Sequence, residues 1–129
     1  MDGVIEVIKS FPDFIGANGK SEEEISKAEL ALGVSFAPDY REYLKEIGLA
    51  CFNGHEMTGI TNIARVDVEK VTKEQREQNT AVPSDWYVIE EANIDGIVIW
   101  QSTTGEVYQT LPDHSGVKIA DNLRGYILK

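Results

Sequence analysis

The spacing of apolar residues changes along this chain, and that change constrains the fold more than any other feature. As far as about residue 48, apolar side chains recur every three or four residues, as they do on one face of an α-helix. From about residue 84, they form short runs rich in β-branched and aromatic residues, separated by turn-forming residues. This order predicts an α+β fold, in which N-terminal helices and a C-terminal helix pack on one side of an antiparallel β-meander.

Capping and turn residues set the expected ends of these elements. Helices are expected at residues 4–11, ended by Pro12; from the N-cap Ser21 to Gly33; from Pro38 to a C-cap at Gly48; from a cap at Asp67 to about residue 78; and within 121–129. Strands are expected within 86–91, 96–101, 105–111 and 117–120, and Asn53-Gly54 predicts a hairpin turn before them. Because no internal repeat or low-complexity linker interrupts this order, residues 1–129 are expected to form a single domain.

The sequence Gly19-Lys20-Ser21 resembles the end of a phosphate-binding loop, which would indicate a nucleotide-dependent enzyme. That loop needs a glycine five residues before Gly19, where this chain has Phe14. The acidic residues that follow Ser21 would also repel a phosphate. Ser21 and Glu24 instead have the spacing of a capping box, in which each side chain binds the backbone N–H of the other residue. The stretch therefore predicts a helix start.

Few residues have the spacing of a catalytic or metal site. Cys51 and His55 lie four residues apart, but the only other histidine is His114, and a structural zinc site needs four nitrogen or sulfur ligands. We expect Cys51 to be a buried hairpin residue; a Cys–His nucleophile would need a third, orienting group that the sequence cannot place. Glu90 and Glu91 are neighbours in a strand and so point to opposite faces, which rules them out as an acid/base pair. We expect no catalytic residues, no cofactor and no metal.

The charge of the chain restricts its partners. It has 22 acidic and 12 basic residues and a formal net charge of −10. Nucleic acids and anionic membranes both require a basic patch, so neither is an expected partner, whereas a basic protein is. Solubility alone is the other explanation of the charge. The single cysteine, and the absence of a signal peptide pattern or a long apolar run, favour a cytoplasmic location.

The acidic residues concentrate in the predicted meander, together with large aromatic residues. No lysine or arginine occurs between Glu77 and Val117. Strand alternation places three aromatic residues beside acidic ones, and we predict a partner-binding surface made of Trp86, Trp100, Tyr108, Glu90, Asp95 and Glu106. The alternative is that the aromatic side chains belong to the core and the acidic side chains are only solvated.

Several segments, taken in order, resemble the SUKH superfamily, of the Smi/Knr type. They are "ISKAELALGVSFAPDYREYLKEIGLACFNGHEMTGI", "VPSDWYVIEE", "DGIVIW", "TTGEVYQ" and "IADNLRGYI". The resemblance covers about residues 20–128. Two positions depart from the family pattern: Ala37 stands where leucine is usual, and Gln101 where an aspartate often precedes the turn.

The resemblance implies a SUKH domain with an α+β fold and no enzymatic activity. For bacterial members it implies an immunity protein that binds and neutralises a cognate polymorphic toxin, frequently a nuclease. For eukaryotic relatives it implies an interaction scaffold in cell-wall regulation, and this remains the alternative function. Glu29 matches an acidic position of the family's helix and is a further candidate for partner binding; its other explanation is a structural ion pair with a base such as Arg41.

Overall fold

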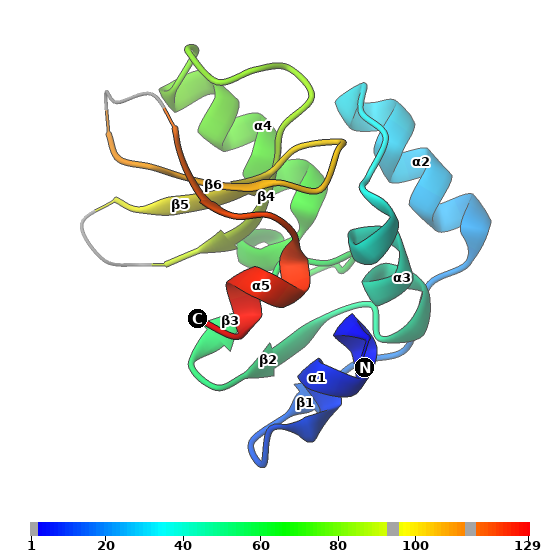
Figure 1. The fold of residues 1–129 in the computed structure, drawn as a ribbon. Helices are drawn as coiled ribbons and strands as arrows, with labels where there is room; N and C mark the ends of the chain where they lie inside the picture. Colours follow the sequence, from blue (N-terminus) through cyan, green and yellow to red (C-terminus); the bar gives the residue numbers. More distant parts are fainter. Residues whose placement is uncertain (1–2, 93–95, 113–115) are drawn as a thin grey trace.

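The computed structural model describes residues 3–92, 96–112 and 116–129, and in these residues it has the predicted α+β architecture (Figure 1). The helices are α1 (Val4–Ser10), α2 (Glu22–Leu32), α3 (Pro38–Glu46), the 3₁₀ turn η1 (Ala64–Val66), α4 (Val68–Gln78) and α5 (Leu123–Ile127). An antiparallel sheet of order β1-β2-β3 consists of Ile15–Gly16, Ala50–Phe52 and His55–Glu56. A second antiparallel sheet of order β4-β5-β6-β7 consists of Tyr87–Glu91, Val98–Gln101, Val107–Thr110 and Val117–Ala120.

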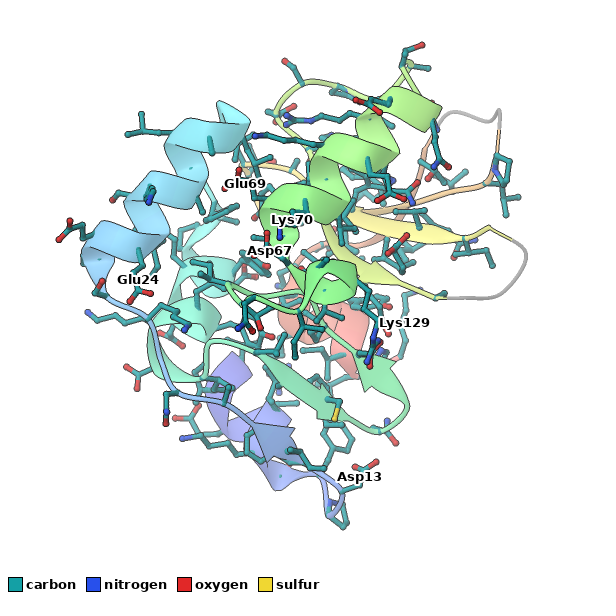
Figure 2. The ribbon with its side chains drawn as sticks, turned by 180° about the vertical axis from the view of Figure 1, so that it is seen from behind. Asp13, Glu24, Asp67, Glu69, Lys70 and Lys129 are labelled. Atoms are coloured by element: carbon teal, nitrogen blue, oxygen red, sulfur yellow. The ribbon has the colours of Figure 1, made fainter. Side chains whose placement is uncertain are left out.

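The predicted N-caps at Ser21 and Asp67 form as the sequence indicates. The side chain of Ser21 accepts a hydrogen bond from the backbone N–H of Glu24, and the Glu24 carboxylate accepts one from the backbone of Ser21. Asp67 caps α4 by accepting from the N–H of Lys70, and Figure 2 shows Glu24 and Asp67 at the starts of their helices. The predicted cap at Gly48 is one residue too late, because Ile47 caps α3 and Gly48 follows it with a φ of 81°.

Gly19 has a packing role that explains the glycine of the Gly-Lys-Ser stretch. A Cβ at this position would lie 1.9 Å from the carbonyl oxygen of Lys45, at the end of α3. The next residue, Lys20, donates its backbone N–H to the carbonyl of Leu44 at 2.9 Å. The segment therefore needs a glycine to lie directly against α3, and phosphate binding is not needed to explain it.

The main core lies between one face of the four-stranded sheet and the helices α1, α2, α3 and α5. Tyr87, Ile89 and Val107 project from the sheet into this core, where they meet buried side chains such as Leu44 of α3 and Leu123 of α5. The N-terminal and C-terminal helices thus pack on the predicted side of the meander. Figure 1 shows α5 in front of the sheet and α4 behind it.

Helix α4 covers the opposite face at its β4 edge, a position that the sequence pattern did not give. Val71 of α4 packs on Trp86 and Trp100 in a second, smaller hydrophobic cluster. The guanidinium of Arg76 donates to the carbonyl of Leu32 at the end of α2 (3.0 Å) and to the carbonyls of residues 84 and 86. Arg76 thereby ties α4 to α2 and to the entry of β4.

Candidate partner-binding surface

The predicted aromatic surface is not exposed, because its two tryptophans are buried. Trp100 has no exposed surface and Trp86 is 7% exposed. The Trp100 indole N–H donates to the Thr110 hydroxyl at 2.9 Å, and Trp86 stacks on Tyr108 with ring centroids 4.1 Å apart. The expectation that Trp86 and Trp100 are exposed anchors is therefore wrong, and the core alternative holds for both. Tyr108, half-buried, is the part of this cluster that reaches the surface.

Glu90 lies on the other face of the sheet from the tryptophans, contrary to simple alternation. The register between β4 and β5 shifts between Val88 and Glu90, so that Val88 pairs with Trp100 whereas Glu90 pairs with Ile99. This irregularity, a β-bulge in effect, directs Glu90 to the main core. It leaves Glu91, which pairs with Val98, on the face of the tryptophans.

The buried carboxylate of Glu90 is fully engaged in hydrogen bonds. Its Oε1 lies 2.9 Å from Nδ1 of His55 and accepts the Tyr126 hydroxyl at 2.5 Å, while its Oε2 accepts the backbone N–H of Glu56 at 3.0 Å. Burial by itself would raise the pKa of Glu90, but the hydrogen bonds from His55 and Tyr126 outweigh it, and the pKa lies below its ordinary value. Glu90 joins β3, β4 and α5, which is a structural task.

Glu106 is at the surface, as predicted, but its charge is compensated. Lys118 lies 2.9 Å from its carboxylate and also 2.8 Å from Asp121. The Tyr108 hydroxyl donates to Glu106 at 3.1 Å. The hydrogen bond from Lys118, followed by that from Tyr108, lowers the pKa of Glu106. Asp95, the remaining acid of the predicted surface, lies outside the described residues.

Glu29 makes the ion pair that its structural explanation requires. Its carboxylate accepts from Nη2 of Arg41 at 2.8 Å and from Nε of Arg41 at 3.1 Å, and it also accepts the backbone N–H of Phe36 at 2.7 Å. The Arg41 hydrogen bond is the main reason that the pKa of Glu29 is lowered. These contacts fix the segment between α2 and α3 and place the Glu29 side chain, which is 15% exposed, in a structural role.

Gln101, where the family often has an acid, is also explained by its contacts. Its amide oxygen accepts the Tyr87 hydroxyl at 2.7 Å, and its amide nitrogen donates to Asp39 at 2.9 Å. The other oxygen of Asp39 accepts the N–H of Leu123, the first residue of α5. An amide both accepts and donates, whereas a carboxylate could not donate to Asp39.

The region around Cys51 and His55 has no metal-site geometry. Among the residues that the structure describes, no three potential ligands come together to hold a metal ion. Cys51 is half-buried rather than buried as expected. It lines an apolar groove of about 180 Å³ on the three-stranded sheet, beside the exposed side chains of Ile15 and Ile63.

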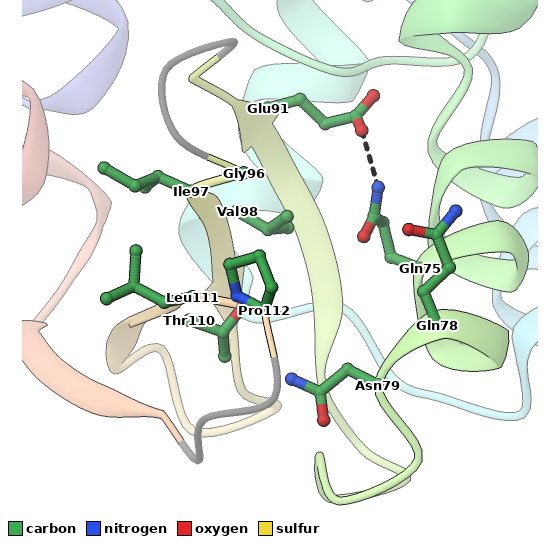
Figure 3. A pocket seen from close by; sticks show the side chains of 10 residues that line it. All are labelled: Gln75, Gln78, Asn79, Glu91, Gly96, Ile97, Val98, Thr110, Leu111 and Pro112. Atoms are coloured by element: carbon green, nitrogen blue, oxygen red, sulfur yellow. Dashed lines mark hydrogen bonds between the residues drawn. The ribbon is translucent and has the colours of Figure 1, made fainter.

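A pocket that the sequence did not predict opens between the end of α4 and the ends of β4, β5 and β6 (Figure 3). Its volume is about 180 Å³, and it is lined by Gln75, Gln78, Asn79, Glu91, Gly96, Ile97, Val98, Thr110, Leu111 and Pro112. Of these described lining residues, only Glu91 is charged. Gln75 donates its amide N–H to Glu91 at 2.7 Å. The sequence signal for this pocket was weak, since its polar residues come from a helix and from strands distant in the chain.

Comparison with known families shows to which group this architecture belongs. A family model described as SMI1-KNR4 cell-wall, of the SUKH group, matches residues 1–129, the whole chain. The chain belongs to the SUKH superfamily. No curated protein matches this SUKH chain. The family match extends the resemblance seen in the sequence to α1 and β1. In the part of this SUKH protein that the structure describes, no helix is both long and apolar enough to span a membrane.

Proposed function

We propose that this SUKH protein is an immunity protein, which binds a cognate polymorphic toxin domain and neutralises it without catalysis. The observation that carries the proposal is the match of the whole chain to a family that includes immunity proteins. Binding alone is sufficient for this task, because a bound inhibitor blocks the toxin by occupying its surface. The proposal includes neither a cofactor nor a nucleic acid or membrane partner.

The charge distribution supports a toxin with a basic surface, such as that of a nuclease. The formal net charge is −10, and within the described residues Glu77 and Asp85 are exposed acids without an ion pair. Uncompensated charge of one sign accelerates the encounter with a partner of opposite sign. Rapid capture matters to an inhibitor that must reach the toxin before the toxin reaches its target.

Co-expression in bacterial cells tests the proposal. A toxin domain encoded next to this chain should stop growth when expressed alone, and co-expression of the SUKH protein should restore it. The two proteins should also co-purify as a complex. A toxin that stays lethal despite abundant folded SUKH protein would contradict the pairing. Stable recovery of a cellular complex without any toxin would favour the scaffold function instead.

A further inference from the structure

We propose that the pocket between α4 and the ends of β4–β6 binds the side chain of an arginine presented by the protein partner. The identity of that partner rests on the proposed function, whereas the preference of the pocket for arginine can be tested without it.

The size of the pocket suits one side chain. Its volume is about 180 Å³. Pockets for drug-sized ligands and cofactors are typically about 300–1,000 Å³, and a cavity of about 150 Å³ is sufficient for benzene. A nucleotide or a peptide segment would be too large, so the occupant is a single protruding group.

Three polar side chains of the pocket, Glu91, Gln75 and Gln78, present hydrogen-bond acceptors. A carboxylate can only accept, so the amide nitrogen of Gln75 must face Glu91, to which it donates at 2.7 Å. This bond turns the amide oxygen of Gln75 into the pocket, and Figure 3 shows the amide oxygen of Gln78 pointing the same way. These oxygens favour an occupant that donates several hydrogen bonds.

The charge and the apolar walls of the pocket favour arginine as the occupant that donates these hydrogen bonds. Glu91 is half-buried, and among the described residues only Gln75 bonds to its carboxylate, through Oε2, which leaves Oε1 available to a ligand. Figure 3 shows Pro112 across the pocket from the amides, where it can contact an aliphatic stem. Arginine combines such a stem with a planar cation that has five N–H donors, and its guanidinium is less strongly hydrated than the ammonium of lysine. An anion would meet the Glu91 charge, and none of the described lining residues is basic.

A titration followed by NMR tests this preference directly. The probes are N-acetyl-arginine amide and its neutral analogue N-acetyl-citrulline amide. The Trp100 indole N–H is a reporter, since it donates to Thr110 in the pocket lining. The side-chain amides of Gln75 and Gln78 are two further reporters. We expect saturable shifts with the arginine probe, at a dissociation constant of millimolar order, and much weaker shifts with citrulline.

Two variants that remove the same charge distinguish a direct contact between arginine and Glu91 from an effect of the net charge of the protein. Glu91→Gln and Glu77→Gln remove the same charge, but the exposed Glu77 does not line the pocket. We expect Glu91→Gln to weaken arginine binding about tenfold and Glu77→Gln to change it by less than about twofold. Absent shifts, equal shifts with both probes, or equal losses in both variants would each overturn the proposal.

The same two variants test whether the partner uses the pocket. With the toxin domain, Glu91→Gln should increase the dissociation rate about tenfold, whereas Glu77→Gln should mainly slow association. Equal effects of the two variants on dissociation would show that the pocket is not a contact. If the wild-type protein does not bind the toxin at all, the proposed function fails, and the titration still decides which group the pocket binds.

Discussion

The two faces of the four-stranded sheet are both apolar, but they differ in how completely their polar side chains are hydrogen-bonded within the protein. On the face covered by α5, the buried polar side chains form closed networks: Glu90 with His55 and Tyr126, and Gln101 with Tyr87 and Asp39. The face covered by α4 has a tryptophan cluster and, beside it, a pocket into which hydrogen-bond acceptors point. Satisfied buried networks stabilise and specify a fold, whereas unfilled acceptors at the surface are available to a partner. The α5 face therefore holds the satisfied polar networks, and the α4 face holds the pocket that we propose for recognition.

The largest expected effect is on stability, and it tests whether Trp100 on the α4 face is a core residue or an interface residue. Trp100→Ala should lower the free energy of unfolding by about 3–5 kcal/mol, because it removes a fully buried side chain and leaves Thr110 without its donor. Urea unfolding measures the loss. Tyr108→Ala, which truncates a half-exposed side chain, is the control and should cost much less. A stable, folded Trp100→Ala protein that has lost only partner binding would restore the interface explanation.

Neighbouring glutamates allow the two faces to be compared at one point of β4. Glu90→Gln should lower the free energy of unfolding by about 1–3 kcal/mol. The amide N–H group of the glutamine would face N–H and O–H donors that now bind the Glu90 carboxylate. Glu91→Gln should be nearly neutral, since Gln75 can turn its amide to match. Chemical denaturation of both variants measures the difference. Similar costs at both positions would argue against a specialised α5 face.

The Glu90 network also predicts a pH dependence. Because the pKa of Glu90 is lowered in the folded protein, the unfolded chain binds more protons as the pH falls. The contribution of Glu90 is therefore complete above the ordinary carboxyl pKa and is lost as the pH falls through the lowered folded value. The difference in stability between wild type and Glu90→Gln should shrink on acidification, as measured by urea unfolding over a pH series. A difference that stays constant through that range would contradict the assignment.

At the start of α2, the expected effect is smaller. Ser21→Ala should cost about 1 kcal/mol, because the backbone N–H of Glu24 loses its acceptor. Lys20→Ala should leave stability almost unchanged, since Lys20 contacts α3 through its backbone. Thermal unfolding compares the two. Nucleotide affinity that disappears in the Lys20 variant would revive the phosphate-loop interpretation.

The smallest expected effect concerns the exposed rim of the α4 face. Glu106→Gln should leave stability unchanged within error, because its pairing with Lys118 is solvent-exposed. If the toxin approaches this face, the variant should associate more slowly at low salt and like wild type at high salt. Stopped-flow association rates at several salt concentrations measure this. A change in dissociation rate alone would indicate a direct contact at Glu106.

The sequence predicted the elements well and the candidate site poorly, and both results have physical causes. Caps such as Ser21 and Asp67 act within one helical turn, so a local pattern reveals them. The register shift before Glu90 involves no glycine or proline and depends on how β4 packs, so alternation placed that side chain on the wrong face. The burial of Trp100 depends in turn on where α4 lies. The pocket escaped prediction because it exists only where α4 and the sheet meet.

The link between Asp39 and Leu123 joins residues 84 positions apart in the chain. Through it, the N-terminus of α5 is held by α3, and the buried side chains of α5 complete a core to which α1, α2 and α3 contribute. Contacts of such long sequence separation form late and slowly. The N-terminal helices therefore cannot close their core during synthesis until the residues of α5 have emerged from the ribosome. A nascent chain stalled before Leu123 should therefore remain sensitive to protease, because α5 has not yet completed this core.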